Sequence, residues 1–163
     1  MEKTGMSDKQ PMTINGKALL EAELKNLLQV ERPQVIKAIE EARDHGDLSE
    51  NADYDAAKER QGFIESRIAE IQTKLATAEV VDPKKVGSDR ITFGATVTLT
   101  DLEEDREVTY QIVGEDEADV KQGKISIFSP LARALIGKRV DDVVEISTPK
   151  SDKEYEINNI DYK

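Results

Sequence analysis

Two acidic residues near the middle of the chain, Asp47 and Glu50, could together take part in metal chemistry. They lie three residues apart, so if a helix begins there both side chains project from the same side of its first turn. Carboxylate oxygens suit Mg²⁺, which commonly binds one or two protein carboxylates together with phosphate oxygens and water. Such a pair is an incomplete site, so we predict weak metal binding by the chain alone. The alternative is that these acids only cap a helix and complement its dipole.

The acidic pair lies in a polar stretch, residues 44–54, that separates two segments with a helical spacing of apolar residues. This pattern predicts a helical hairpin with the acidic stretch at its tip. Gly46 can adopt the positive φ that a tight turn needs. The second helix is predicted to begin near Ser49 or Asn51, since either side chain can cap a helix.

Apolar spacing defines the two arms of the predicted hairpin. The first arm has Thr13 or Asn15 as N-cap, and Pro33 then shifts the phase of its apolar stripe, which predicts a kinked or broken helix. The second arm has a heptad pattern that Pro83 ends. The stripe consists of Leu20, Leu24, Leu27, Val35, Ile39 and Ala42 in the first arm and of Ile64, Ile68, Ile71, Leu75 and Ala78 in the second.

Beyond a polar linker, residues 84–91, the apolar residues alternate with a period of two, which predicts five or six short strands. One short helix, Leu131 to Ile136, is predicted after Ser129-Pro130. The strands are marked by Val97 with Leu99, Val108 with Tyr110 and Ile112, Ile125 with Ile127, Val144 with Ile146, and Tyr155 with Ile157. We therefore predict an α+β chain of two domains: a disordered tail (1–11), an antiparallel α-helical coiled-coil finger (12–83) and a sheet-and-helix domain (92–163).

Composition narrows the classes of function. The 163 residues include 23 basic and 34 acidic ones, a net charge of -11. This charge argues against a protein that grips a nucleic-acid backbone by itself. The absence of cysteine excludes disulfides and thiolate metal sites. No apolar run approaches the ~18 residues of a membrane span, and no signal-peptide core is present, so we predict a cytoplasmic protein without a membrane partner.

Several runs of residues closely resemble bacterial Gre transcript-cleavage factors, in family order. They cover nearly everything from Met12 to the C-terminus, and the few, dispersed basic residues of the finger resemble the GreA type more than the GreB type. The runs are residues 46–54 (GDLSENADY), 56–63 (AAKERQGF), 93–97 (FGATV), 110–114 (YQIVG), 116–119 (DEAD) and 129–138 (SPLARALIGK).

The resemblance implies a two-domain factor of bacterial RNA polymerase whose globular domain has an FKBP-like fold. It implies that this domain docks on the β′ coiled coil at the rim of the polymerase secondary channel, while the finger enters the channel. There Asp47 and Glu50 would help to hold the second Mg²⁺ jointly with the polymerase and orient the attacking water. The polymerase would then cleave backtracked RNA, so the chain is predicted to be no enzyme itself and to hold no cofactor in isolation.

The resemblance also assigns roles to further residues. Gly46, Asn51 and Tyr54 would shape the tip and orient water or RNA. Arg43 and Lys58 match basic positions that could meet the RNA 3′ end, although such charges are also ordinary on a solvated rod. The predicted docking segment comprises Ser129, Pro130, Leu131, Ala132 and Arg133.

Three alternatives remain open at this point. Asp44, Asp53 and Asp55 lie near the acidic pair, and related inhibitory factors on the same scaffold carry additional tip acids. The intact Gly-Asp-Leu-x-Glu-Asn pattern favours cleavage stimulation instead. From other classes, the chain could be a prolyl isomerase with a coiled-coil arm, or a holdase or scaffold whose hairpin is purely structural.

Overall fold

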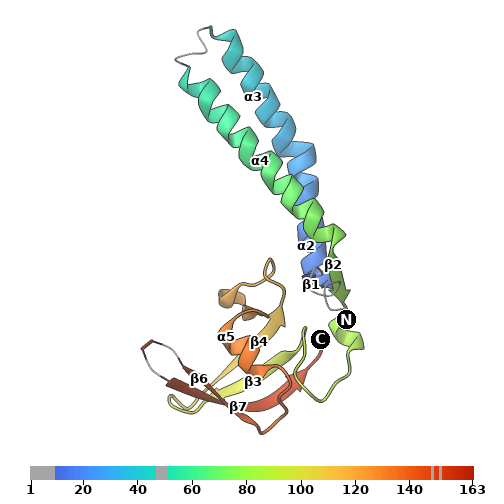
Figure 1. Ribbon diagram of the computed structural model, residues 1–163, viewed down its shortest axis with the longest axis vertical. Helices are drawn as coiled ribbons and strands as arrows, with labels where there is room; N and C mark the ends of the chain where they lie inside the picture. The colour runs from blue at the N-terminus through green and yellow to red at the C-terminus, as the bar shows by residue number, and fades with distance from the viewer. Residues whose placement is uncertain (1–9, 47–50, 148, 151) are drawn as a thin grey trace, which may run out of the picture. The chain divides into compact units, whose positions relative to one another are not determined.

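The computed structural model describes residues 10–46, 51–147, 149–150 and 152–163 (Figure 1). It divides into two compact units. The hairpin unit is Ala18–Thr77, and the C-terminal unit combines Ala78–Lys163 with the segment that ends at Lys17. The predicted two-part α+β architecture is therefore confirmed. The boundary after the hairpin lies at Thr77, earlier than the predicted boundary at Pro83.

Paired helices form the hairpin unit, in which α3 and α4 lie side by side (Figure 1). The helix α4 begins after Asn51, which is one of the two predicted N-caps. Most of the predicted apolar stripe is buried, from Leu20 on the first arm to Ile71 on the second. The helical segments are α2 (Ile14–Asn26), a π-helical segment η1 (Leu27–Glu31), α3 (Arg32–Asp44) and α4 (Ala52–Ala76).

The π-helical segment explains the phase shift that Pro33 marks. Leu20 and Leu27 are seven residues apart, whereas Leu27 and the next buried stripe residue, Val35, are eight apart. A π-helical turn closes its hydrogen bond over five residues, and here the Arg32 N–H donates to the Leu27 carbonyl. The segment therefore absorbs the extra residue and keeps both halves of the stripe buried. The regular α-helix is therefore interrupted by a π-helical segment, while the helical backbone continues through Pro33 without the predicted break.

A pair of short strands, β1 (Gln10–Thr13) and β2 (Ala78–Val81), corrects the sequence analysis at both ends of the hairpin. The strands pair in parallel, with Met12 opposite Val80. The second helix was predicted to continue until Pro83, but α4 ends at Ala76 because Val80 and Val81 favour extended backbone and Pro83 disfavours helix before it. Gln10 and Pro11 belong to β1 and not to a disordered tail; the rest of that predicted tail lies outside the described residues.

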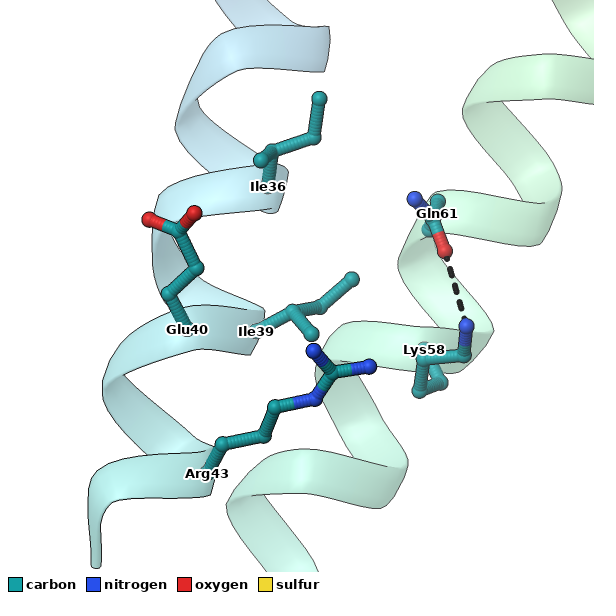
Figure 2. Close-up of a pocket in the computed structure, with 6 residues that line it drawn as sticks. All are labelled: Ile36, Ile39, Glu40, Arg43, Lys58 and Gln61. Atoms are coloured by element: carbon teal, nitrogen blue, oxygen red, sulfur yellow. Dashed lines mark hydrogen bonds between the residues drawn. The ribbon is translucent and has the colours of Figure 1, made fainter.

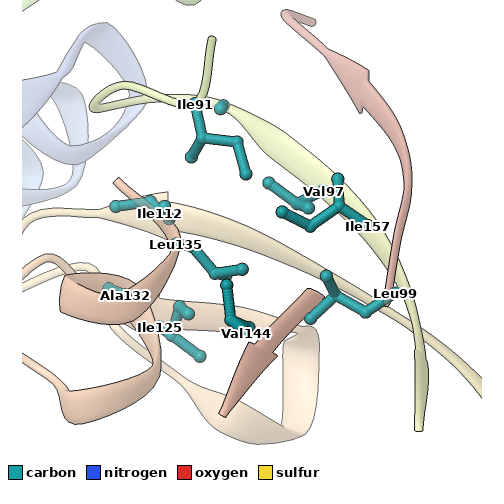
Figure 3. Packing of buried hydrophobic residues seen from close by; sticks show 10 residues of the cluster. Ile91, Val97, Leu99, Ile112, Ile125, Ala132, Leu135, Val144 and Ile157 are labelled. Atoms are coloured by element: carbon teal, nitrogen blue, oxygen red, sulfur yellow. The ribbon is translucent and has the colours of Figure 1, made fainter. Parts of the chain in front are cut away.

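A five-stranded sheet in the order β5-β4-β3-β7-β6 forms the C-terminal unit, together with the predicted short helix. Its buried side chains gather into one apolar cluster that includes Ile91, Leu99 and Leu135 (Figure 3). Ile91 is fully buried and bonds through its backbone to Gly137 and Lys138, so the predicted linker 84–91 ends before it. The elements are η3 (Pro83–Lys85), β3 (Thr96–Asp101), β4 (Arg106–Val113), η4 (Val120–Gln122), β5 (Lys124–Ser126), α5 (Pro130–Leu135), β6 (Val143–Ser147) and β7 (Asp152–Asp161).

All five predicted strand segments are thus found. Their apolar residues alternate with polar ones because only one face of the sheet is packed against the apolar cluster. On β3, Val97 and Leu99 are buried while Thr96, Thr98 and Thr100 lie on the other face. Within the described part of the chain, no helix is long and apolar enough to span a membrane.

Candidate functional site

The backbone at the end of α3 turns sharply before the acidic pair. The His45 N–H donates to the Ala42 carbonyl and the Gly46 N–H to the Arg43 carbonyl, both at 3.2 Å. Gly46 has φ +109°, as predicted, and a Cβ built on it would meet no atom within 4 Å. Glycine is needed here for its backbone conformation and not for space.

Asn51 connects the two helix ends. Its Oδ1 accepts the Tyr54 N–H at 3.1 Å and caps α4, and its Nδ2 donates to the Ala42 carbonyl of α3 at 2.7 Å. The first N–H groups of a helix have no intrahelical partner, and Asn51 satisfies one of them on α4. On α3 it adds a second hydrogen bond to the Ala42 carbonyl, which also accepts the His45 N–H. The predicted role of Asn51 in shaping the tip has this geometric basis. Tyr54 contributes its backbone N–H, and its side chain is half-buried.

The predicted acidic pair, Asp47 and Glu50, lies outside the described residues. The helix α4 begins at Ala52, so the premise that both acids occupy its first turn is not met. Both residues precede the N-cap Asn51 in the chain.

The two basic residues predicted near the tip lie on the two facing helices of the hairpin. Arg43 on α3 and Lys58 on α4 line one shallow pocket of about 200 Å³ with Ile36, Ile39, Glu40 and Gln61 (Figure 2). The Lys58 Nζ donates to Gln61 Oε1 at 3.2 Å. Arg43 is exposed, makes no ion pair with any residue that the structure describes, and in Figure 2 reaches toward α4. Gln61 was not among the predicted site residues, although its spacing of three from Lys58 places both on one face of α4.

A second shallow pocket, of about 210 Å³, also adjoins the hinge. Its lining includes His45 and Asp53, one residue from each side of the hinge, with Ala38, Glu41 and Ala42. His45 is exposed, as expected for a surface turn residue. Among the described residues, no group of three or more histidine, cysteine, aspartate or glutamate side chains could hold a metal ion.

Two arginine–carboxylate pairs hold the first arm against α4, one on each side of the π-helical segment. Arg67 binds Glu23 through two nitrogens at 2.7 and 2.8 Å, and Arg32 binds Glu65 in the same way at 2.8 and 2.7 Å. Such bidentate bonds fix geometry as well as charge. The hydrogen bond from Arg67 lowers the pKa of Glu23, and the bond from Arg32 lowers the pKa of Glu65. These pairs were not predicted from the sequence, because only the register between the two packed arms brings the partners together.

The predicted docking segment divides into buried and exposed residues. Ser129 is the N-cap of α5 and accepts the Ala132 N–H at 3.2 Å, while Pro130 occupies the first turn. Ala132 is fully buried and Leu131 packs against the apolar cluster. Only Pro130 and Arg133 of the five are exposed, so a partner would meet those two side chains first.

Known protein families match this chain over both of its units. Residues 10–80 match the family profile described as "Transcription elongation factor, N-terminal", and residues 85–162 match "Transcription elongation factor, GreA/GreB, C-term". Fold and profiles together define a two-domain transcription elongation factor. The chain belongs to the GreA/GreB family.

Individual relatives extend this match over nearly the whole chain. Transcription elongation factor GreA of Syntrophotalea carbinolica is 60% identical over 157 residues, 96% of this chain and 99% of that protein. The GreA of Neisseria meningitidis serogroup A is 57% identical over 155 residues, 94% of this chain and 98% of that protein. A solved structure, GreA factor homolog 1 of Thermus thermophilus, is 28% identical and covers 93% of this chain and 98% of its own, with a TM-score of 0.43 that is too low to support an argument. The relatives favour an elongation factor over the inhibitor, isomerase and holdase alternatives.

Proposed function

We propose that this chain binds bacterial RNA polymerase and stimulates the polymerase's intrinsic cleavage of backtracked RNA. In this proposal the hairpin enters the secondary channel and the restored RNA 3′ end allows an arrested complex to resume. The observation that carries the proposal is the nearly full-length identity of 57–60% to proteins named transcription elongation factor GreA. An acidic chain can serve such chemistry because the polymerase supplies most of the grip on the nucleic acid.

The hinge supports this proposal through the way it is closed. Asn51 holds the end of α3 and the start of α4 together through its two hydrogen bonds. Asp47 and Glu50 lie between these two helix ends in the sequence. Because the residues on either side are anchored, less conformational freedom is lost when a segment between them binds a partner site.

The proposed chemistry divides between the chain and the polymerase. A second Mg²⁺, held jointly with the polymerase active site, would supply charge stabilisation in phosphodiester hydrolysis. The carboxylates of Asp47 and Glu50 would bind at that site and orient the attacking water. Arg43 and Lys58 would neutralise phosphate charge near the RNA 3′ end, since both line one pocket beside the hinge.

The C-terminal unit would provide the docking surface. In this proposal Pro130 and Arg133 contact the β′ coiled coil at the channel rim, and Ser129, Leu131 and Ala132 hold α5 in place. The burial of Ala132 and the capping bond of Ser129 support this division.

The test is RNA cleavage in a stalled, backtracked bacterial elongation complex with wild type and the Asp47→Ala/Glu50→Ala double variant. We expect wild type to stimulate cleavage and the variant to lose about 10²-fold of that stimulation while binding polymerase normally. The control is Glu21→Ala/Glu59→Ala, which removes two exposed acids of the hairpin unit with the same change of charge. Equal activity of the acidic-pair variant and wild type would refute the role of the pair, and inhibition by wild type would favour the inhibitory alternative.

A further inference from the structure

Glu117 is a buried carboxylate of the C-terminal unit. Its residue is 7% exposed, and it lies in the turn that follows β4. Burying a carboxylate is unfavourable unless hydrogen bonds and opposite charge compensate it. The groups that compensate the burial of the Glu117 carboxylate therefore have to be identified.

Three donors surround the Glu117 carboxylate: one from the last residue of β1, one from the first turn of α2, and Lys124. The Thr13 hydroxyl donates to Oε1 at 2.5 Å and the Asn15 Nδ2 donates to Oε2 at 2.9 Å. Lys124 Nζ approaches Oε2 at 3.3 Å and supplies the compensating charge. Because both oxygens are engaged by protein donors, the group is suited to holding structure and not to binding a ligand.

Thr13 links Glu117 to the first turn of α2 through its hydroxyl group. While its hydroxyl donates to Glu117, its oxygen accepts the Gly16 N–H at 3.0 Å, which is the N-cap bond of α2. Gly16 is buried, and a Cβ there would lie 2.8 Å from Glu117 Oε1. The close fit of Thr13, Gly16 and Glu117 fixes the first turn of α2 to the turn after β4.

We propose that Glu117 is a positioning residue for stimulated cleavage, acting through Thr13 on the first turn of α2. This inference rests on the proposed function. The helix α2 leads into the arm that ends at the hinge, so freedom in its first turn would be passed on to the acidic pair. Small misplacements of a reacting group reduce rate strongly. Docking, by contrast, depends on α5 and would not change.

The first experiment measures cleavage against factor concentration for wild type, Glu117→Gln, Thr13→Val and Thr13→Ser. We expect Glu117→Gln and Thr13→Val to lower the maximal rate at saturation by about tenfold, with the half-saturating concentration changed less than twofold. Thr13→Ser keeps the hydroxyl and should restore the rate. The double variant Thr13→Val/Glu117→Gln should lose no more than either single one, because both remove one coupled contact. Glu115→Gln, an exposed acid of the same turn, is the matched control.

The second experiment tests the contact without any polymerase. Amide exchange at Gly16 should become about tenfold faster in Glu117→Gln, while the amide of Ile68 in α4 is unchanged. If wild type stimulates no cleavage, the proposed function fails, and exchange at Gly16 still decides whether Glu117 holds the helix start. Unchanged exchange, an unchanged maximal rate, or a shift in half-saturation alone would each overturn the inference. Should Glu117→Gln fail to fold, the maximal cleavage rate and the Gly16 amide exchange of Thr13→Val, compared with those of Thr13→Ser, decide whether the contact positions the helix.

Discussion

At the scale of single residues, Asn51 has two partners that only a side-chain amide can serve at once. Its oxygen accepts a helix N-terminal N–H and its nitrogen donates to a helix C-terminal carbonyl. Aspartate could serve the first partner but not the second, and would bring a negative charge beside the Ala42 carbonyl. Both bonds are expected to contribute to the hairpin.

Replacing Asn51 by alanine should destabilise the hairpin unit by about 1–3 kcal/mol, the sum of a lost N-cap and a lost carbonyl partner. Asn51→Asp should retain the cap and lose part of that amount. Urea unfolding followed by helical circular dichroism measures both. The control is Asn26→Ala, since Asn26 makes one exposed bond to Glu31 in the same unit. Equal losses at Asn26 and Asn51 would contradict the bridging role.

The environment of Asp101 leads us to expect that the stability of the C-terminal unit depends on pH. Hydrogen bonds from the Glu104 and Glu103 N–H groups, with the charge of Lys153, lower the pKa of Asp101. Because the folded pKa lies below the unfolded value of about 3.9, the ionised group stabilises the fold above that pH. This stabilisation is lost as pH falls through the lowered folded value.

Asp101→Asn should therefore lower the melting temperature at pH 7, and the difference from wild type should shrink below about pH 4. Thermal unfolding at pH 7, 5 and 3 measures this. Asp89→Asn changes the net charge equally at an exposed position and serves as control. A difference that stays constant from pH 7 to 3 would show that the carboxylate charge is not the cause.

At the scale of elements, the π-helical segment decides whether the first arm can bury its whole stripe. The segment adds one residue between Leu27 and Val35, and the Arg67–Glu23 and Arg32–Glu65 pairs hold the arm on either side. Deleting one residue inside the segment would restore a spacing of seven. Deleting one residue beyond it would rotate everything up to the hinge by about 100°.

Removal of Gln29 in a Pro33→Ala background should leave the hairpin unit about as stable as Pro33→Ala alone. The proline is replaced because its ring clashes with the preceding turn of a regular α-helix. Removal of Lys37 in the same background should cost about 2–4 kcal/mol, since Ile39 and Ala42 leave the buried face. Urea unfolding compares the two deletions. Similar losses from both would contradict the one-residue account of the π-helical segment.

At the scale of the whole molecule, the proposed division of labour predicts two separable phenotypes. Arg133→Ala should raise the concentration for half-maximal cleavage on the order of fivefold, equivalent to about 1 kcal/mol of binding, with an unchanged maximal rate. Asp47→Ala/Glu50→Ala should lower the maximal rate and leave the concentration for half-maximal cleavage unchanged. Titration of stalled complexes measures both, and Lys85→Ala serves as the exposed basic control. A lowered maximal rate in Arg133→Ala would contradict a pure docking role.

The features that could be predicted from the sequence are those that depend on residues close together in the chain. The stripes of the hairpin, the five strands of the sheet, the Asn51 cap and the Gly46 turn follow from spacing, capping and backbone preference. The pairing of β1 with β2 and the contact of Thr13 with Glu117 join positions far apart in the chain, and no local pattern marks them. The placement of the acidic pair was argued from a helix that in fact begins at Ala52.

The parallel pairing of β1 with β2 has a consequence for the order of assembly. Parallel strands need a crossover connection, and here the whole hairpin, residues 14–77, is that connection. A flexible chain of this length makes strand closure entropically unfavourable, whereas a zipped hairpin brings its two ends together beforehand. We expect α3 and α4 to pair first and the strands to close later. Pulse-labelled amide exchange during refolding would reveal the reverse order if β1 and β2 became protected before α4.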